Sequence, residues 1–274
     1  MTHYCHIAPT PHLEDFAVYN KVHLMLAHLA ENDRDYSNWY RDRKELKILD
    51  NSAFEMYKQG RPMYESDKLM DMASRTKADV IVMSDYPGEN SAKTIDAAER
   101  LGPQFKAAGY QTFFVPQSKV GDMDDYLFAW NHAINSPNVD FIGMSILGVP
   151  NAFGNIEKDN KLQRFLSRWK MMHILESRGM LDNAWENGKK IHFLGALDGW
   201  LGEIKLVEQW KDYIFSWDSS GAIWLGLHGN KTYDDSPTGQ IDGKYEIEVD
   251  FNFSTDDSLR ILNAHDNIQK VNQL

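Results

Sequence analysis

Ile214-Phe215-Ser216-Trp217-Asp218-Ser219-Ser220 is an apolar run that ends in an aspartate and then breaks into small polar residues. Two other segments have the same form, Ile48-Leu49-Asp50-Asn51-Ser52-Ala53-Phe54 and Val82-Met83-Ser84-Asp85. A buried parallel strand that delivers a carboxylate to the rim of an active site has this pattern. Three such segments in one chain indicate a parallel α/β enzyme.

Apolar runs predict eight strands along the chain. The middle six runs are nearly continuous, so both of their faces should be covered. The predicted strands are Tyr4–Ala8, Lys47–Asp50, Val80–Ser84, Thr112–Pro116, Phe141–Ile146, Ile191–Leu194, Tyr213–Trp217 and Tyr245–Phe251. The last one alternates acidic and apolar residues, and it either closes the sheet or lies outside it in a hairpin.

Helical patterns fill most of the gaps between these strands. They cover Leu13–Glu31, Ser66–Thr76, Asn90–Ala108, Asp122–Asn135, Ile156–Arg178, Asp198–Lys211 and Thr255–Gln269. The alternation and the length of 274 residues predict one TIM (β/α)8-type barrel domain over residues 1–274, since such barrels take roughly 250 residues. No helix pattern is visible in residues 226–244, so the last strands are expected to be irregular.

Composition narrows the classes of protein. The single cysteine, Cys5, excludes an intrachain disulfide and a multi-cysteine zinc site. His3, His6 and His12 match no standard ligand spacing, and we expect neither a metal nor a cofactor. No apolar run approaches the ~18 residues that cross a bilayer, and no secretory signal is visible. We therefore expect a cytoplasmic protein without a membrane partner.

The strand ends supply the candidate catalytic groups. Asp50 follows the second predicted strand, Asp85 the third, Gln117 the fourth and Asp218 the seventh. Tight turns, Leu147-Gly148 and Leu194-Gly195, follow the fifth and the sixth. Carboxylates that meet an amide and exposed backbone amides in one pocket suit general acid/base or nucleophilic catalysis.

An ordered series of motifs gives these residues a family resemblance. The motifs are Asp50-Asn51-Ser52-Ala53-Phe54, Ser84-Asp85, Val115-Pro116-Gln117, Ile142-Gly143-Met144-Ser145-Ile146-Leu147-Gly148, His192-Phe193-Leu194-Gly195 and Trp217-Asp218-Ser219. In order and spacing, over residues 45 to 220, the series resembles the tRNA-guanine transglycosylase superfamily. That family has a TIM barrel and exchanges a guanine in a polynucleotide for a 7-deazaguanine base.

The resemblance implies a role for each residue. Asp218 is the implied nucleophile at C1′ of the target nucleotide, and Asp50 is the implied general acid/base. The base itself would be stacked on Phe54 and would be bound by Asp85, Gln117, Gly148, Leu194 and Gly195. A carboxylate on one face of the sugar stabilises an oxocarbenium-like carbon.

The sequence departs from the tRNA enzymes in two places. One cysteine cannot build their Cys3His zinc site, and Ser219-Ser220-Gly221-Ala222 replaces their Pro-Thr-Arg segment after the nucleophile. With its short length, the chain is most similar to compact phage and bacterial relatives that insert 7-deazaguanines into DNA. The implied partners are DNA, favoured over tRNA, and a free 7-deazaguanine base, in the host cytoplasm if the protein is viral.

Two basic segments are candidate nucleic-acid contacts. Lys158, Lys161, Arg164 and Arg168 recur at helical spacing, and Arg41 and Arg43 lie beside Trp39. Cations mixed with aromatic rings suit a nucleic-acid strand, although a solvated helix face gives the same pattern. The formal net charge of −11 weakly disfavours a polyanionic partner. Salt screens surface charges beyond roughly 8 Å, so a local basic strip can still bind a polyanion on an acidic protein.

Other interpretations of the same residues stay open. Asp50 has the sequence of an Asx turn with Ser52, Asp85 precedes a turn, and Asp218 is placed to cap the next segment. His192, on an apolar strand, has the pattern of a core histidine. At the level of function, the alternatives are a tRNA-guanine transglycosylase, a nucleoside or glycoside hydrolase with the same carboxylates, and a non-catalytic barrel that binds a purine or a nucleic acid. The oligomeric state is open.

Overall fold

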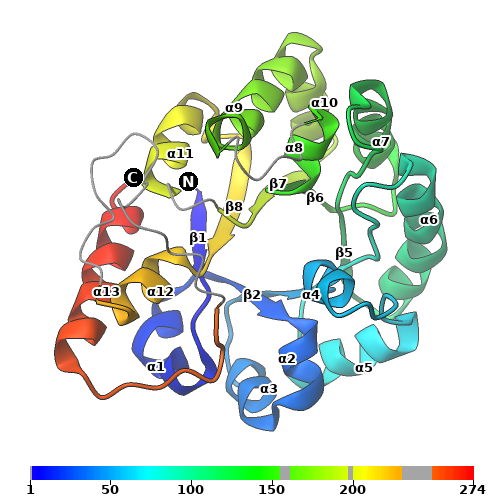
Figure 1. Cartoon of the computed structure of the whole chain (residues 1–274). Helices are drawn as coiled ribbons and strands as arrows, with labels where there is room; N and C mark the ends of the chain where they lie inside the picture. Colours follow the sequence, from blue (N-terminus) through cyan, green and yellow to red (C-terminus); the bar gives the residue numbers. More distant parts are fainter. Residues whose placement is uncertain (1, 155–160, 197–199, 230–248) are drawn as a thin grey trace.

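The strands form a barrel surrounded by helices. The computed structural model describes residues 2–154, 161–196, 200–229 and 249–274. In these residues eight parallel strands make one sheet in the order β1-β8-β7-β6-β5-β4-β3-β2, which is nearly closed and is ringed by helices (Figure 1). The predicted fold class, a TIM barrel, is confirmed.

The strands overlap seven of the eight predicted segments. Their bounds are β1 His3–His6, β2 Val22–Leu26, β3 Leu46–Asp50, β4 Val80–Val82, β5 Gln111–Phe114, β6 Phe141–Ser145, β7 Lys190–Leu194 and β8 Ile214–Ser219. The ladders between neighbouring strands in that order are parallel, and they pair for example Leu26 with Asp50 and Cys5 with Asp218. The carboxyl ends of the strands therefore gather at one end of the barrel.

The assignment of the second strand is a correction. The predicted helix Leu13–Glu31 is wrong, because Val22–Leu26 is a fully buried strand between short helices: α1 Leu13–Phe16, a 3-10 helix Ala17–Tyr19 and α2 Ala27–Asn32. A short apolar run fits either period, so the sequence alone does not separate the two. The predicted strand Tyr245–Phe251 lies mostly outside the described residues, and its described residues 249–251 are not in a strand.

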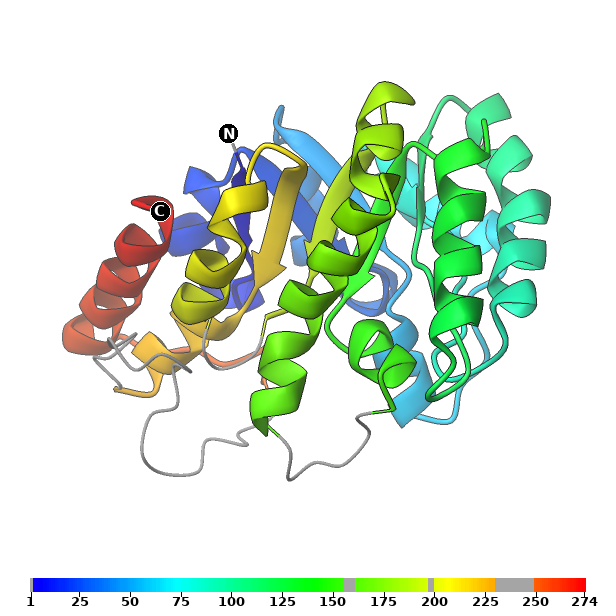
Figure 2. The same cartoon turned by 90° about the horizontal axis from the view of Figure 1, so that it is seen from above.

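The remaining helices follow the predicted alternation. They are α3 Arg34–Arg41, α4 Ala53–Lys58, α5 Ser66–Thr76, α6 Ser91–Ala107, α7 Met123–Asn135, α8 Gly148–Ala152, α9 Lys161–Ser177, α10 Met180–Glu186, α11 Trp200–Val207, α12 Gly221–Leu227 and α13 Ser258–Asn272, with 3-10 helices Thr10–His12 and Glu208–Trp210. The short helices α4, α8 and α12 lie at the end toward which the arrow of β8 points (Figure 2). They cover the rim between the strands and the outer helices.

Two apolar cores hold the barrel. One fills its interior and contains Cys5, Ile7, Val22, Leu24, Leu26, Ile48, Val80, Val82, Phe113, Val115 and Phe141. The larger one packs the outer faces of the strands against the helices. Because side chains alternate along a strand, Asp50 points to the same side as the interior residue Ile48. The interior core thus forms the floor under the rim carboxylates.

Close packing of α12 on α13 gives a stability prediction. A Cβ atom at Gly226 would lie 2.3 Å from the backbone N and Cα of Ala264, so Gly226→Ala should lower the free energy of unfolding by about 3 kcal/mol. Gly60→Ala is the control, since a Cβ there meets nothing within 4 Å and only its φ of +63° is strained, at about 1 kcal/mol. Urea unfolding measures both. An equal loss in the two variants would rule out the helix contact as the cause.

Candidate active site

The four polar side chains that the sequence places at strand ends do lie on one rim. Asp50 and Asp218 are within β3 and β8, while Asp85 and Gln117 follow β4 and β5. Asp85 and Gln117 are in direct contact. The negative charges of Asp85 and Asp218 both raise the pKa of Asp50. Asp50 therefore lies close enough to both other aspartates to sense their charges.

Asp218 is fixed by strand β7. Its Oδ1 accepts hydrogen bonds from His192 Nε2 at 2.9 Å and from the Gly195 backbone N at 3.0 Å. The other ring nitrogen of His192 lies 2.6 Å from Ser216 Oγ. A neutral His192 that carries its proton on Nε2 and accepts from the Ser216 hydroxyl satisfies all of these contacts. No described residue donates a hydrogen bond to Asp218 Oδ2.

This arrangement decides between two interpretations of Asp218. A helix cap would bond to the backbone of α12, but Ser219 Oγ accepts the hydrogen bond from Gly221 N there. The Asp218 carboxylate faces β7 instead and is only 5% exposed. Neither Ser216 nor a link from His192 to Asp218 is predicted from the sequence. Both follow from register, because His192 and Ser216 are partners in the β7–β8 ladder.

Asp85 joins two amides. Asn51 Nδ2 donates to Asp85 Oδ1 at 2.9 Å and to the Met83 carbonyl at 2.7 Å, and Gln117 Nε2 donates to Asp85 Oδ2 at 2.6 Å. The other end of the Gln117 amide, Oε1, is buried and has no hydrogen-bond partner in the described part of the chain. A buried acceptor without a donor is costly, which makes it a position for a ligand N–H group. The sequence places Asn51 at the rim without a role, and the structure shows that its amide binds Asp85.

The site contains a glycine that leaves room for this acceptor. A Cβ atom at Gly148 would lie 2.8 Å from Gln117 Oε1. Gly148→Ala should therefore push the Gln117 amide aside and weaken binding of a base at least about tenfold, the size expected for one lost hydrogen bond to a buried group. Isothermal titration with a free 7-deazaguanine measures the loss. Unchanged affinity in a folded variant would remove Gln117 Oε1 from the binding site.

Asp50 sits in a strained turn. Its Oδ2 accepts a hydrogen bond from Ser52 N at 2.9 Å, so the Asx turn is present and the carboxylate also reaches the rim. Ser52 has a φ of +54°, which costs a non-glycine residue about 1–2 kcal/mol, and its Oγ lies 3.0 Å from His28 Nδ1. Burial and the charge of Glu55 raise the pKa of Asp50 well above its ordinary value. A carboxyl group with a raised pKa is a better proton donor for general acid catalysis than an ordinary aspartate.

The buried carboxyl of Asp85 predicts a pH dependence of stability. Burial raises the pKa of Asp85, whereas the hydrogen bonds from Asn51 and Gln117 lower it. Burial has the larger effect, and the resulting pKa is about 6. The folded protein then holds a proton that the unfolded chain releases near pH 4, so stability is lost as pH rises through about 6. The unfolding free energy of wild type relative to Asp85→Asn should fall by roughly 2 kcal/mol between pH 4 and pH 7. Urea unfolding across that range measures this, and a pH-independent difference would contradict it.

The other predicted base-binding residues lie at the same end of the barrel. Phe54, on α4, is 46% exposed, and its role in stacking stays a prediction. Leu194 presents its carbonyl to Ile146 N at 3.0 Å and to Arg168 Nη1 at 3.1 Å. Gly195 presents its N–H to Asp218. The turn after β7 is therefore part of the same rim as Asp218.

The predicted basic stripe on the long helix is wrong for Arg168. This residue is 1% exposed, and Glu203 binds its guanidinium at 2.6 and 2.7 Å. Helical spacing puts residues on one face but does not say whether that face is buried. Lys158 lies outside the described residues, as do the side chains of Lys161 and Arg164.

The second basic cluster is at the other end of the barrel. Arg41 and Arg43 directly precede β3, so they lie at the amino ends of the strands, opposite to Asp50. Each is already paired, Arg41 with Asp42 at 3.2 Å and Arg43 with Glu14 at 2.8 Å. Arg43 also stacks on Trp39. These residues therefore lie away from the rim aspartates, and their contact with a nucleic acid stays a prediction.

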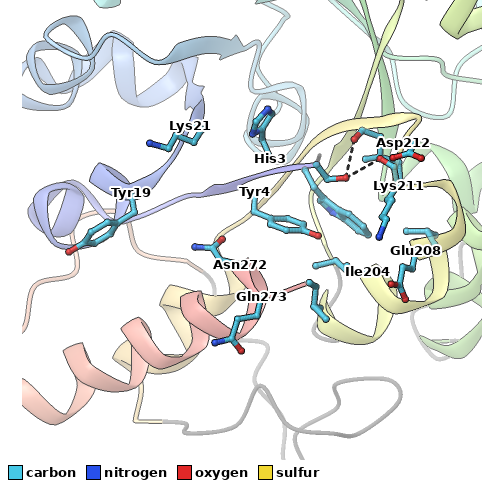
Figure 3. A pocket seen from close by; sticks show the side chains of 15 residues that line it. His3, Tyr4, Tyr19, Lys21, Ile204, Glu208, Lys211, Asp212, Asn272 and Gln273 are labelled. Carbon is cyan, nitrogen blue, oxygen red and sulfur yellow. Dashed lines mark hydrogen bonds between the residues drawn. The ribbon is translucent and has the colours of Figure 1, made fainter.

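A separate hollow of about 530 Å³ opens at the amino ends of β1 and β8. Tyr4, Ile204 and Lys211 line it together with the last turn of α13, as the labelled side chains show (Figure 3). Thr2 Oγ1 closes one side by donating to the backbone of β8 and of the segment before it. The hollow is not part of the rim that carries the aspartates.

Comparisons with known proteins add little to this geometry. No family model matches the chain, and no curated protein does. Among solved structures, it is similar to an HpcH/Hpal aldolase/citrate lyase family protein from Burkholderia cenocepacia J2315, with 11% identity, a TM-score of 0.49 and coverage of 81% of this chain and 88% of that one. A shared reaction does not follow from this likeness.

No helix in the described residues could span a membrane. The same residues contain no cluster of His, Cys, Asp and Glu side chains that could hold a metal ion.

Proposed function

We propose that this barrel is a base-exchange transglycosylase that replaces guanine in DNA with a free 7-deazaguanine through a covalent ester on Asp218. The observation that carries the proposal is the asymmetric Asp218 carboxylate. His192 and Gly195 hold Oδ1, which leaves Oδ2 to approach a sugar carbon from one fixed direction. Such fixed placement supplies much of the rate enhancement of a nucleophilic step.

The exchange needs two displacements at C1′. In the first, Asp218 Oδ2 bonds to C1′ while the bond from C1′ to N9 breaks and its electron pair leaves with guanine, which takes a proton from Asp50. In the second, the incoming base gives its N9 proton to Asp50, and its electron pair displaces the Asp218 carboxylate. The raised pKa of Asp50 matches a group that both gives and takes this proton.

The base would be read by the cluster around Asp85. The buried Gln117 Oε1, which lacks a donor among the described residues, accepts an N–H group of a purine-like ring in this proposal. Gly148 keeps the space beside that oxygen open. Phe54, on the exposed side of the rim, stacks on the ring. The preference for DNA over tRNA is supported by the sequence resemblance alone, and the target base must leave its stack at a cost of a few kcal/mol.

The experiment is a release assay with two substrates. An oligodeoxynucleotide and a tRNA, each carrying labelled guanine, are incubated with the protein with and without 7-deazaguanine. We expect repeated turnover of label from DNA only when 7-deazaguanine is present, and without it at most one guanine released per protein molecule, the one expelled when the covalent adduct forms. Release from tRNA only would identify the tRNA type of enzyme, and release into water alone would identify a nucleoside or glycoside hydrolase. Binding without release at any protein concentration would indicate a non-catalytic barrel.

A further inference from the structure

The buried guanidinium of Arg168, on α9, lies directly behind the catalytic rim. Its Nε and Nη2 atoms donate to the two carboxylate oxygens of Glu203, which is 1% exposed like Arg168 itself. Its Nη1 atom donates to the carbonyls of Met144 at 3.2 Å and Leu194 at 3.1 Å. One buried cation thus ties together the carboxyl ends of β6 and β7.

A gain in folding stability does not by itself explain why Arg168 and Glu203 form a buried ion pair. Two buried charges lose their hydration, and well-packed apolar residues in their place are often as stable. The rings of Phe193 and Trp217 lie 5.1 and 5.0 Å from the guanidinium carbon, so an apolar side chain would have neighbours to pack against. The two carbonyl contacts are the feature that apolar residues would not reproduce.

One of those carbonyls belongs to the peptide group that binds Asp218. The Leu194 carbonyl and the Gly195 N–H are parts of one planar peptide unit. Its oxygen faces Arg168, and its N–H donates to Asp218 Oδ1 at 3.0 Å. A donor on the carbonyl side polarises the unit and strengthens the hydrogen bond on the N–H side. The next carbonyl, that of Gly195, is held by Trp217 Nε1 at 2.9 Å.

We propose that Arg168 is a positioning residue for Asp218. It holds the Leu194–Gly195 peptide with its N–H toward Asp218 Oδ1 and polarises that N–H group. Asp218 then keeps one oxygen bound and presents the other. The inference concerns the carboxylate and the peptide only, so it goes beyond the proposed function and holds for any reaction at this rim.

The test uses the double variant Arg168→Met/Glu203→Met, which removes both charges and leaves neither unpaired. Amide hydrogen exchange by NMR measures Gly195 against Phe193, a residue of the same strand. We expect the ratio of the Gly195 rate to the Phe193 rate to rise about tenfold, the effect of weakening one charge-assisted hydrogen bond. Lys106→Met is the control, because it removes a half-buried partner of Asp140 at the amino ends of the strands. The ratio should not change in it.

An unchanged ratio in the folded double variant would overturn the inference. If that variant does not fold, Glu203→Gln serves instead, since it weakens the hold on the guanidinium while keeping the shape of the side chain. The ratio should rise in it too, by about threefold for the partial loss of one hydrogen bond, and no rise would count against the inference. The measurement needs no substrate. Suppose the wild-type protein shows no base-exchange activity, but the ratio of amide hydrogen-exchange rates rises in the double variant. The proposed function would then be contradicted, and the role of Arg168 would be supported.

Discussion

Asp218→Asn is expected to abolish base exchange, with a loss on the order of 10⁴-fold or more, as when the nucleophile of an enzyme is removed. The substitution is a selective test because asparagine has nearly the same shape as aspartate. Its oxygen still accepts from His192 Nε2 and Gly195 N, which bond Asp218 Oδ1 in the native protein. Only the second oxygen, the attacking atom of the proposed mechanism, is replaced by an amide nitrogen.

The measurement is incorporation of labelled 7-deazaguanine into DNA at saturating base. Asp182→Asn is the matched control, because Asp182 is exposed on α10 and its carboxylate contacts only Tyr213 among the described residues. The control should keep wild-type activity. Exchange by Asp218→Asn within tenfold of wild type would show that another group is the nucleophile, or that the reaction has no covalent intermediate.

Asp50→Asn is expected to lower exchange by about 10²- to 10⁴-fold, the range for loss of a general acid/base. The leaving base would then depart without a proton, and the group assigned to take the N9 proton of the incoming base would be lost. The affinity for DNA should stay within about twofold, because Asp50 acts on the reacting base. Single-turnover kinetics separate the two effects, and a loss in affinity with an unchanged rate would contradict the role.

The same variant should gain stability. Burial and the charges of Glu55, Asp85 and Asp218 raise the pKa of Asp50, so the ionised group destabilises the fold at high pH. The sign follows from linkage, since a raised acid pKa means stability that is lost as pH rises through it. At pH 8, Asp50→Asn should therefore unfold at higher urea than wild type, with the difference smaller at pH 4. A variant that is less active and less stable at both pH values would indicate a structural role.

The rim residues could be predicted from the sequence because the pattern that marks each of them lies within a few neighbouring residues. Each of Asp50, Asp85, Gln117 and Asp218 follows an apolar run, and parallel strands bring such ends together. The misassigned strand, Val22–Leu26, failed for a physical reason. Its four apolar residues and His23 are buried on both faces, and Val22, Met25, Leu26 and Leu29 also satisfy a helical period.

The contacts around the carboxylates were beyond the sequence. The approach of Ser216 to His192, the clamp of Asn51 and Gln117 on Asp85, and the burial of Arg168 all depend on packing between distant elements. Period-two alternation does put Ser216 and Asp218 on one face of β8, but pairing them with His192 needs the β7–β8 register. Spacing alone gave Arg168 the pattern of a surface cation.

The central claim is that Asp218 becomes covalently attached to the sugar of the target nucleotide. Its most direct test is mass spectrometry of the protein after incubation with a guanine-containing oligodeoxynucleotide and no incoming base. We expect an oligonucleotide adduct that maps to Asp218, is absent from Asp218→Asn and disappears when 7-deazaguanine is added. Exchange without any adduct, or an adduct on Asp50, would contradict it.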